Sequence, residues 1–331
     1  MSSETENVLE VDKLITSFET DCGLLRAVDH VSFTVPAGKT VGIVGESGCG
    51  KSVTAMSIIR LLPQPSGKIL GGHVHFGGCD LVRATDAEMR KIRGGQIGVI
   101  FQEPMAALNP VHRIGRQVSE VFRIHKKISK KDAWDAATEM LELVRIPAPE
   151  KRMMDYPHHL SGGMRQRIVI AMALACRPSL LIADEPTTAL DVTVQAQILD
   201  LMARLQSEMG MATILITHDL GVIAETCDDV VVMYAGRVVE RASAEELFSN
   251  PLHAYTKGLL RSIPTLETPS KSVLNTIPGM VASLADLSHG CRFCQRMGRN
   301  SAVTRERPAF AEVSPGHWVE TCPECTSNIK H

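Results

Sequence analysis

The sequence predicts an α/β protein built on a mostly parallel sheet that is covered by helices. Short apolar runs with the character of buried strands alternate along the chain with amphipathic helical patterns, and this alternation is typical of parallel sheets with crossover helices. The strand candidates are Lys39–Gly45, Ile97–Phe101, Leu180–Asp184, Thr213–Thr217 and Val230–Tyr234. Apolar residues recur on one face from Thr193 to Met209, which predicts a helix there.

Length and composition indicate a soluble globular protein of roughly two structural units. The chain has 331 residues, of which 44% are hydrophobic and 22% charged, and its formal net charge is −2 at pH 7. Such a charge gives no bulk attraction to nucleic acid or anionic lipid, so we expect no nucleic-acid partner. Neither a membrane-spanning apolar run nor a secretion signal is recognisable in the sequence. We therefore expect any membrane association to go through a protein partner.

Two regions differ from the alternating pattern. Residues 113–177 carry helical patterns throughout, with capping-box spacing at Ser129 and Asp132, and predict an all-helical insertion. After Ser249 the patterns weaken and prolines recur. The sequence thus predicts a main domain over residues 1–250 and an extension over residues 251–331 that lies outside the sheet.

A complete phosphate-binding motif follows the first strand candidate. Residues 45–52, GESGCGKS, match G-x-x-x-x-G-K-S/T between a strand and a helix, a context that disfavours a chance glycine turn. In such a loop, backbone N–H groups converge on phosphate oxygens, Lys51 reaches the β- and γ-phosphates and Ser52 binds Mg²⁺. The candidate nucleotide-binding residues of the loop are Gly45, Glu46, Ser47, Gly48, Cys49, Gly50, Lys51, Ser52 and Val53.

Two adjacent carboxylates, Asp184 and Glu185, end the strand candidate Leu180–Asp184. Taken alone, such a pair is more often a solvated strand end. The carboxyl ends of parallel strands face the ligand in folds of this class, however, and a complete phosphate loop lies upstream. We therefore expect Asp184 to position Mg²⁺ and Glu185 to act as general base on the attacking water.

At this point several motifs resemble those of ATP-binding-cassette (ABC) ATPases, in the order expected of that family. Residues 160–167, LSGGMRQR, look like the signature sequence, and residues 188–191, TALD, like the D-loop. The resemblance covers nearly all of residues 8–265. It implies a P-loop NTPase (RecA-like) core with an antiparallel β-subdomain, an α-helical insertion and a C-terminal cysteine-containing extension.

The resemblance also implies residue roles. Gln102 resembles the glutamine-loop residue, which senses Mg²⁺ and water. His218 resembles the switch histidine, which contacts the γ-phosphate and holds Glu185 and the water in line. The alternative interpretation is a histidine at a strand end whose hydrogen bonds are satisfied within the protein. Phe18 resembles the aromatic residue that stacks on adenine, although a core position is equally expected for it. Across a head-to-tail dimer, further residues would contact ATP held by the second subunit: Ser161, Gly162, Gly163 and Asp191.

Longer stretches are similar to the ATPase subunits of bacterial dipeptide and oligopeptide importers, a group that includes nickel importers. They are FQEPMAALNP at 101–110, NTIPG at 275–279 and PLHAYTKGLLRSIP at 251–264. This similarity implies a second ATPase subunit in a heterodimer, two membrane permeases, an external solute-binding protein and a peripheral position at the cytoplasmic face of the inner membrane. Permease coupling would involve residues 102–110. The alternatives are import of nickel or another small solute, and a soluble ABC ATPase without permeases.

The extension contains two C-x-x-C pairs, Cys291 with Cys294 and Cys322 with Cys325. In a reducing compartment such pairs indicate metal ligands, and doubled pairs suit a tetrahedral Zn²⁺ site. The family resemblance implies a [4Fe–4S] cluster instead, but Met297 stands where the family usually has its next cysteine. Spacing does not separate the two metals. Two further alternatives for the cysteines are a metal or redox sensor and thiols without a ligand. His289 and His317 are candidate replacement ligands, although we expect both at the surface.

Overall fold

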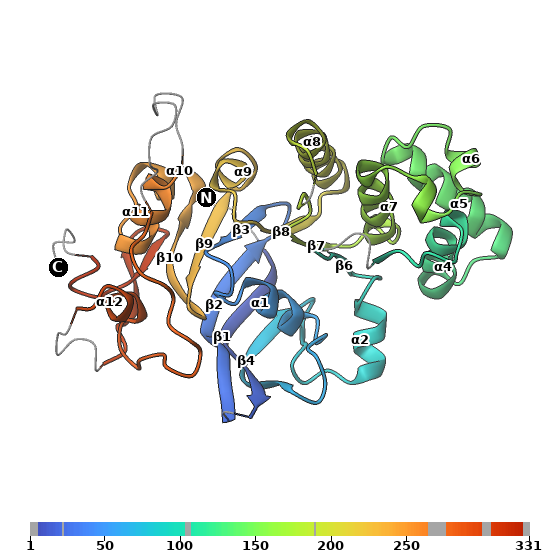
Figure 1. The fold of residues 1–331 in the computed structure, drawn as a ribbon. Helices are drawn as coiled ribbons and strands as arrows, with labels where there is room; N and C mark the ends of the chain where they lie inside the picture. Colours follow the sequence, from blue (N-terminus) through green and yellow to red (C-terminus); the bar gives the residue numbers. More distant parts are fainter. Residues whose placement is uncertain are drawn as a thin grey trace. The chain divides into compact units, whose positions relative to one another are not determined.

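The structure, a computed structural model, describes residues 6–21, 23–102, 107–188, 190–263, 276–299 and 306–326. The chain forms two compact units, whose elements are labelled in Figure 1. Unit 1 comprises Met1–Leu9, Val35–Lys39 and Arg83–Ile216, and unit 2 comprises Glu10–Thr34, Thr40–Val82 and Thr217–His331. The predicted division of the chain into domains at residue 250 stays a prediction.

Three parallel strands form the sheet of unit 1: β6 (Ile97–Ile100), β7 (Leu180–Asp184) and β8 (Ala212–Ile216). The middle strand, β7, pairs in parallel with both neighbours. Every residue of β7 and β8 is buried, which explains why both strands appear in the sequence as continuous apolar runs. The helix that follows β7 is α8 (Val192–Met209). These elements confirm the sequence predictions to within one or two residues at each end.

The predicted helical insertion is confirmed within the described residues of unit 1. It contains α4 (Ile114–Lys126), α5 (Lys130–Leu143), the short α6 (Pro149–Arg152), a 3₁₀ turn at Pro157–His159 and α7 (Gly162–Leu174), which gather in one group in Figure 1. Ser129 caps α5, because its Oγ accepts a hydrogen bond from the Asp132 backbone N–H at 3.2 Å. Before the insertion, α2 (Asp86–Ile92) begins at a Thr85 capping box.

Unit 2 carries two sheet regions. A four-stranded sheet has the order β2 (Gly23–Pro36), β1 (Asn7–Thr20), β4 (Gly67–Phe76) and β5 (Cys79–Asp80), and most of β1 belongs to this unit. In the second region, β3 (Thr40–Val44) pairs in parallel with β9 (Asp229–Tyr234), and β9 pairs antiparallel with β10 (Arg237–Ser243). The helices around these strands are α1 (Lys51–Ile58), α9 (Leu220–Thr226) and α10 (Ala244–Ser249).

The expectation that residues 251–331 lie outside the sheet is wrong. Two of their strands, β11 (Phe310–Ser314) and β12 (His317–Glu320), extend the sheet of unit 2, because β12 pairs antiparallel with β10 and β11 pairs antiparallel with β12. Both strands are short and of mixed polarity, so they lack the continuous apolar run of a central strand. The extension also forms α11 (Ala254–Arg261) and α12 (Arg292–Arg296).

The core of the extension is continuous with the core of β9 and β10. Tyr234 from β9 packs its ring on Tyr255 from α11 at 4.6 Å between centroids, and the Phe293 ring lies edge-on to Tyr234 at 5.5 Å. The same buried cluster includes the four cysteines of the two C-x-x-C pairs. Among the described residues, no helix is both long enough and apolar enough to cross a bilayer.

Candidate functional site

The phosphate loop connects β3 to α1 within unit 2, and close approach of backbone atoms requires two of its glycines, Gly45 and Gly50. A Cβ atom on Gly45 would lie 2.2 Å from the Met233 carbonyl oxygen, and one on Gly50 would lie 2.7 Å from the Ala27 carbonyl oxygen. Both glycines have positive φ, 152° and 103° respectively. Other residues rarely adopt such backbone angles, so glycine alone fits at both positions.

Lys51 lies over this loop at the first residue of α1. Its Nζ donates hydrogen bonds to the carbonyl oxygens of Gly45, at 2.7 Å, and Glu46, at 3.0 Å. Among the described residues, no side-chain cap satisfies the first N–H groups of α1, and unsatisfied N–H groups at a helix start attract anions. Burial raises the pKa of Cys49, so its thiol stays protonated and acts as a small apolar side chain of the loop.

In unit 1, three predicted motifs converge on one carboxylate oxygen. Glu185 follows β7, and its Oε2 accepts hydrogen bonds from Gln102 Nε2 at 3.1 Å and Thr188 Oγ1 at 2.9 Å. Its φ of 46° is unusual for a residue other than glycine, a strain that is common at functional positions. Asp184, one residue earlier, is buried at the end of β7. The sequence predicted neither of these two hydrogen bonds to Glu185.

The signature and D-loop residues open two helices of unit 1 whose first turns meet. Ser161 Oγ accepts from the Met164 N–H at 3.3 Å and caps α7, and Asp191 caps α8 by accepting from the Val194 N–H at 2.9 Å. A Cβ atom on Gly163 would lie 2.7 Å from the Val194 side chain, so a glycine is needed where the helices approach. Ser161, Gly162 and Asp191 are exposed.

The two remaining candidates of the ATP site belong to unit 2. His218 is exposed and stands two residues after β8, just before α9. Phe18 is half-buried on β1, and a Cβ atom on Gly67 would lie 3.2 Å from its ring, so it packs against β4. This packing agrees with the core alternative for Phe18, whereas its contact with adenine stays a prediction.

All four cysteines of the C-x-x-C pairs meet at one point in unit 2. Their Sγ atoms all lie within 4.8 Å of one another. Cys294 Sγ lies 3.4 Å from Cys325 Sγ and 3.6 Å from Cys322 Sγ, and Cys291 Sγ lies 3.6 Å from Cys325 Sγ. All four are buried free thiols. We call this group the thiolate centre, and it confirms the convergence predicted from the spacing.

The sulfur spacing of the thiolate centre suits a single ion. Four thiolates at about 2.3 Å from one tetrahedral ion lie about 3.8 Å from one another. A [4Fe–4S] cluster binds each thiolate to a different iron atom, which sets the sulfurs farther apart than they are around one ion. The residues therefore fit one thiophilic ion, and the cluster stays a prediction.

Within the part of the chain that the structure describes, neither His289 nor His317, the candidate replacement ligands, is part of the thiolate centre. His317, expected at the surface, is fully buried, and its Nε2 lies 2.9 Å from Glu240 Oε1. The same carboxylate accepts from the Leu252 and His253 backbone N–H groups, so it ties β10 to the start of the extension. The His289 carbonyl oxygen accepts from Arg237 Nη2 at 3.1 Å.

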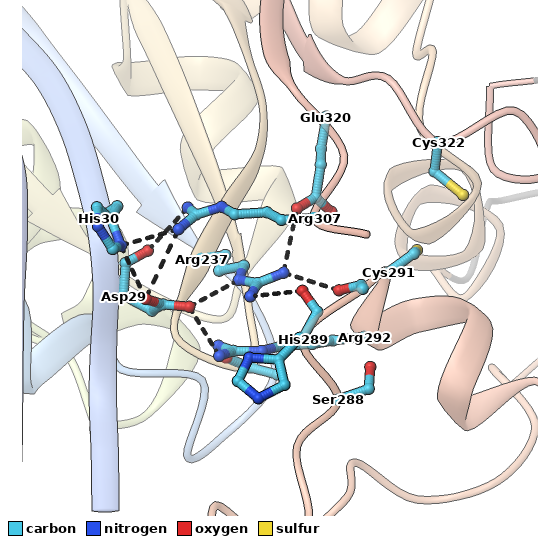
Figure 2. A network of polar contacts seen from close by, with 12 residues as sticks. Asp29, His30, Arg237, Ser288, His289, Cys291, Arg292, Arg307, Glu320 and Cys322 are labelled. Carbon is cyan, nitrogen blue, oxygen red and sulfur yellow. Dashed lines mark hydrogen bonds and ion pairs between the residues drawn. The ribbon is translucent and has the colours of Figure 1, made fainter. Parts of the chain in front are cut away.

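A buried ionic network, shown in Figure 2, surrounds Asp29 of β2. Asp29 Oδ2 accepts from Arg237 Nε and from Arg292 Nη2, both at 2.8 Å, and Oδ1 lies 2.9 Å from His30 Nδ1. Burial alone would raise the pKa of Asp29, but the hydrogen bonds from Arg237 and His30 and the arginine charges hold it well below its usual value.

The same network reaches both cysteine pairs. Arg292 directly follows Cys291, and Arg237 Nη1 lies 3.7 Å from Glu320, two residues before Cys322. Burial is the main reason that the pKa of Glu320 rises to about 7. Sequence reasoning missed this network because its members are polar residues scattered from β2 to β12, without periodicity or shared spacing. Two arginines shared by one buried carboxylate thus fix the thiolate centre to β2 and β10.

Comparison with known families identifies two matching regions. Residues 28–188 match the model of the ABC transporter family, and residues 239–301 match that of the oligopeptide/dipeptide transporter C-terminal region. The second match covers most of β10, all of α11 and the first cysteine pair. It therefore assigns the beginning of the extension to a known family region.

Individual relatives match over nearly the whole chain. A probable peptide ABC transporter ATP-binding protein of Sinorhizobium fredii is 53% identical over 94% of this chain and 93% of its own length. The oligopeptide transport ATP-binding protein OppD of Bacillus subtilis is 50% identical over 95% of this chain and 88% of its own. Among solved structures, the ADP- and phosphate-bound dimer of the ATP-binding cassette MJ0796 has a TM-score of 0.64 at 27% identity, covering 71% of this chain and 98% of that one.

Proposed function

This chain belongs to the ABC transporter family, and from that premise we propose that it hydrolyses ATP to drive the uptake of dipeptides or oligopeptides through partner permeases. The observation that carries the proposal is the similarity over 94% of the chain to a probable peptide ABC transporter ATP-binding protein, extension included. The dipeptide transport ATP-binding protein DppD of Bacillus subtilis is similar to the same extent, with 52% identity over 95% of this chain.

In the proposed ATP site, the phosphate loop binds the triphosphate. Its backbone N–H groups and the start of α1 offer donors to the phosphate oxygens, and Lys51 exchanges the carbonyl oxygens of Gly45 and Glu46 for the β- and γ-phosphates. Mg²⁺ would be held by Ser52, Asp184 and Gln102, whose hydroxyl, carboxylate and amide oxygens are the ligands that it prefers, and it would neutralise charge on the phosphates.

Glu185 is the proposed general base of hydrolysis. It accepts a proton from the water whose oxygen attacks the γ-phosphorus, while the bond to the β–γ bridging oxygen breaks and ADP leaves. Gln102 and Thr188 both bind Oε2, and these two contacts hold the orientation of the carboxylate. His218 is proposed to contact the γ-phosphate and keep the attacking water in line.

A second ATPase subunit completes the proposed site. Ser161, Gly162 and Asp191 are exposed at helix starts, as groups that face ATP across a dimer must be. We propose a heterodimer beneath two membrane permeases, with an external solute-binding protein delivering the peptide. The chain would then be a peripheral protein of the cytoplasmic face of the inner membrane.

ATP hydrolysis by the purified chain tests the enzymatic part. We expect Glu185→Gln to lower the ATPase rate at least about 100-fold while ATP binding is retained, because the base is lost but the phosphate ligands are not. Glu139→Gln, which changes an exposed glutamate of α5 in the same unit, is the matched control. Equal turnover by the Glu185→Gln and wild-type proteins would refute the role of this base.

Uptake measurements test the cargo. In cells that express the chain with its permeases and binding protein, labelled dipeptides or oligopeptides should accumulate, and Glu185→Gln should abolish accumulation. Uptake of Ni²⁺ without peptide uptake would assign the chain to a nickel importer. ATPase activity without co-purification of any permease would favour the soluble alternative and refute transport.

We further propose that the thiolate centre binds one Zn²⁺ ion, with the [4Fe–4S] cluster as the competing assignment. Support comes from the sulfur spacing of 3.4 to 3.6 Å between neighbouring thiols. After anaerobic purification we expect about one zinc per chain, no sulfide, and loss of the zinc in Cys291→Ser but not in Cys79→Ser, which changes an exposed cysteine. Equal amounts of iron and sulfide with broad visible absorption would establish the cluster instead.

A further inference from the structure

The phosphate loop and the extension meet at Glu46, the second residue of the loop. The Glu46 backbone N–H donates to the Tyr255 hydroxyl at 2.9 Å. Its carboxylate accepts from Arg296 Nη1 at 2.6 Å and from Arg296 Nη2 at 3.3 Å. Both partners belong to the extension, and all three residues lie in unit 2. Glu46 is therefore held through its backbone and its side chain at once.

Arg296 is fixed by more than this ion pair. Its Nε donates to the Pro278 carbonyl oxygen at 2.8 Å, and its Nη2 donates to the carbonyl oxygens of Ile277 and Gly279, both at 3.0 Å. The side chain is 4% exposed, and that of Glu46 is 33% exposed. A planar guanidinium with all its nitrogens engaged has one orientation, so this pair is more rigid than an ordinary surface ion pair.

The position of Arg296 depends in turn on the thiolate centre. Arg296 is the last residue of α12, a helix of five residues, which is too short to be stable by itself. Cys291 Sγ caps this helix by accepting from the Cys294 N–H at 3.4 Å. Phe293, between the two cysteines, packs on the ring of Tyr255 at 5.6 Å. The thiolate centre thus supports both residues that hold Glu46.

A second path leads from α12 to the other end of the loop. Arg292 Nη1 donates to the Ala235 carbonyl oxygen in the turn between β9 and β10. The next residue of that turn, Gly236, donates its N–H to the Cys49 carbonyl oxygen at 2.9 Å. The helix α12 is therefore linked to the loop near both of its ends, directly through Arg296 and indirectly through Arg292 and the turn between β9 and β10.

We propose that Arg296 is a positioning residue for ATP binding and that metal in the thiolate centre holds it in place, so that metal occupancy sets the affinity of the phosphate loop for ATP. A loop that is already ordered loses less conformational entropy when it binds its ligand. The proposal rests on the proposed ATP-binding role of the phosphate loop. It adds the extension to the nucleotide-binding machinery.

The first test compares arginine variants of the full-length chain by ATP titration and steady-state kinetics. We expect Arg296→Gln to raise the Kd and KM for ATP about tenfold, with kcat and metal content unchanged. The loop keeps its N–H donors in this variant but loses the ion pair that holds them in position. Arg296→Lys keeps the charge without the forked geometry and should recover part of the affinity. The matched control is Arg299→Gln, since the Arg299 guanidinium contacts Glu324 within the extension instead of the loop.

A double-mutant cycle tests whether the ion pair itself carries the effect. Glu46→Gln removes the same pair from the loop side and leaves the extension intact, so it also decides the matter if Arg296→Gln loses its metal or its fold. We expect the double variant to bind ATP no more weakly than either single variant. Removal of metal by a chelator should weaken ATP binding about tenfold in the wild-type protein and little further in Arg296→Gln.

Unchanged ATP affinity in Glu46→Gln, or fully additive effects in the cycle, would overturn the inference. Lys51→Ala separates this failure from failure of the proposed function. Wild-type ATP binding by Lys51→Ala would refute the role of the phosphate loop itself. Loss of binding in Lys51→Ala together with wild-type binding in Glu46→Gln would refute only the role of Arg296.

Discussion

The phosphate loop and the thiolate centre are both binding sites of unit 2, but they are built in opposite ways. The loop is one contiguous segment, residues 45–52, whose donors are mainly backbone N–H groups and whose shape follows from its glycines. The thiolate centre joins two pairs whose inner cysteines, Cys294 and Cys322, are 28 positions apart, and its ligands are side chains. A contiguous backbone site carries its geometry in its own residues, whereas a site of distant side chains takes its geometry from the surrounding fold.

This difference has a consequence for stability. The close approaches of the loop are to backbone atoms of its own unit, such as the Met233 carbonyl oxygen. Around the thiolate centre, by contrast, buried charges provide the support: Asp29 holds Arg237 and Arg292 at 2.8 Å each. We therefore expect changes in the loop to affect nucleotide binding first, and changes around the thiolate centre to affect folding first.

The largest effect is expected from Gly45→Ala in the phosphate loop. A Cβ atom there would lie 2.2 Å from the Met233 carbonyl oxygen, so the loop must move, and a displacement of that size lowers the ATPase rate about 100-fold. The metal content of the thiolate centre should not change. Gly48→Ala is a useful comparison, since its φ is also positive but no atom lies within 4 Å of the added Cβ. Equal rates for the two variants would contradict the role of close approach.

The same contrast explains what the sequence could predict. The strands β3, β7, β8 and β9 and the phosphate loop were predicted nearly to the residue, because each is a contiguous run with its own signal. Convergence of the cysteines was predictable because a doubled C-x-x-C pattern is typical of thiols that share one metal site.

Contacts between distant polar residues were not predictable. The pairs Arg296–Glu46 and Arg237–Asp29 join residues 250 and 208 positions apart, and nothing in the local sequence marks any of these residues as an ion-pair partner. The strands β11 and β12 were missed for a related reason. They are stabilised by pairing with β10 and with each other, and not by an apolar run of their own.

The next largest effect is expected from Asp29→Asn in the buried network. Removing this carboxylate leaves Arg237 and Arg292 without their shared partner, and an uncompensated buried charge costs about 3–5 kcal/mol of the free energy of unfolding. Because the folded-state pKa of Asp29 is lowered, its contribution is present above the ordinary aspartate pKa and is lost as the pH falls. Chemical denaturation at pH 7 would measure the loss.

A matched control for Asp29→Asn is Glu19→Gln, which removes one partner of the exposed Lys68–Glu19 pair of the same unit. We expect little change in this control, since water screens exposed pairs. Similar losses for the two variants would mean that the buried network adds nothing beyond a surface pair. It would then no longer account for how the thiolate centre is held.

The smallest effect is expected at His317, which joins β12 to β10 and, like Asp29, belongs to the region around the thiolate centre. Burial alone would lower the pKa of His317, but the hydrogen bonds and charges of Glu240 and Glu246 outweigh burial and raise it. Burial alone would raise the pKa of Glu240, but its hydrogen bond with His317 lowers it. The contribution of His317 to stability is therefore complete below its unfolded pKa and is lost as the pH rises through its folded pKa. The contribution of Glu240 is lost as the pH falls through the folded pKa of that carboxyl.

Since a hydrogen bond to a charged group contributes about 1 kcal/mol more than a neutral one, His317→Gln should lower the free energy of unfolding by about that much at pH 6 and by less at pH 9. Urea denaturation of both proteins at the two pH values measures the difference, and a cost that grows with pH would show that His317 stabilises the extension by packing instead of by charge.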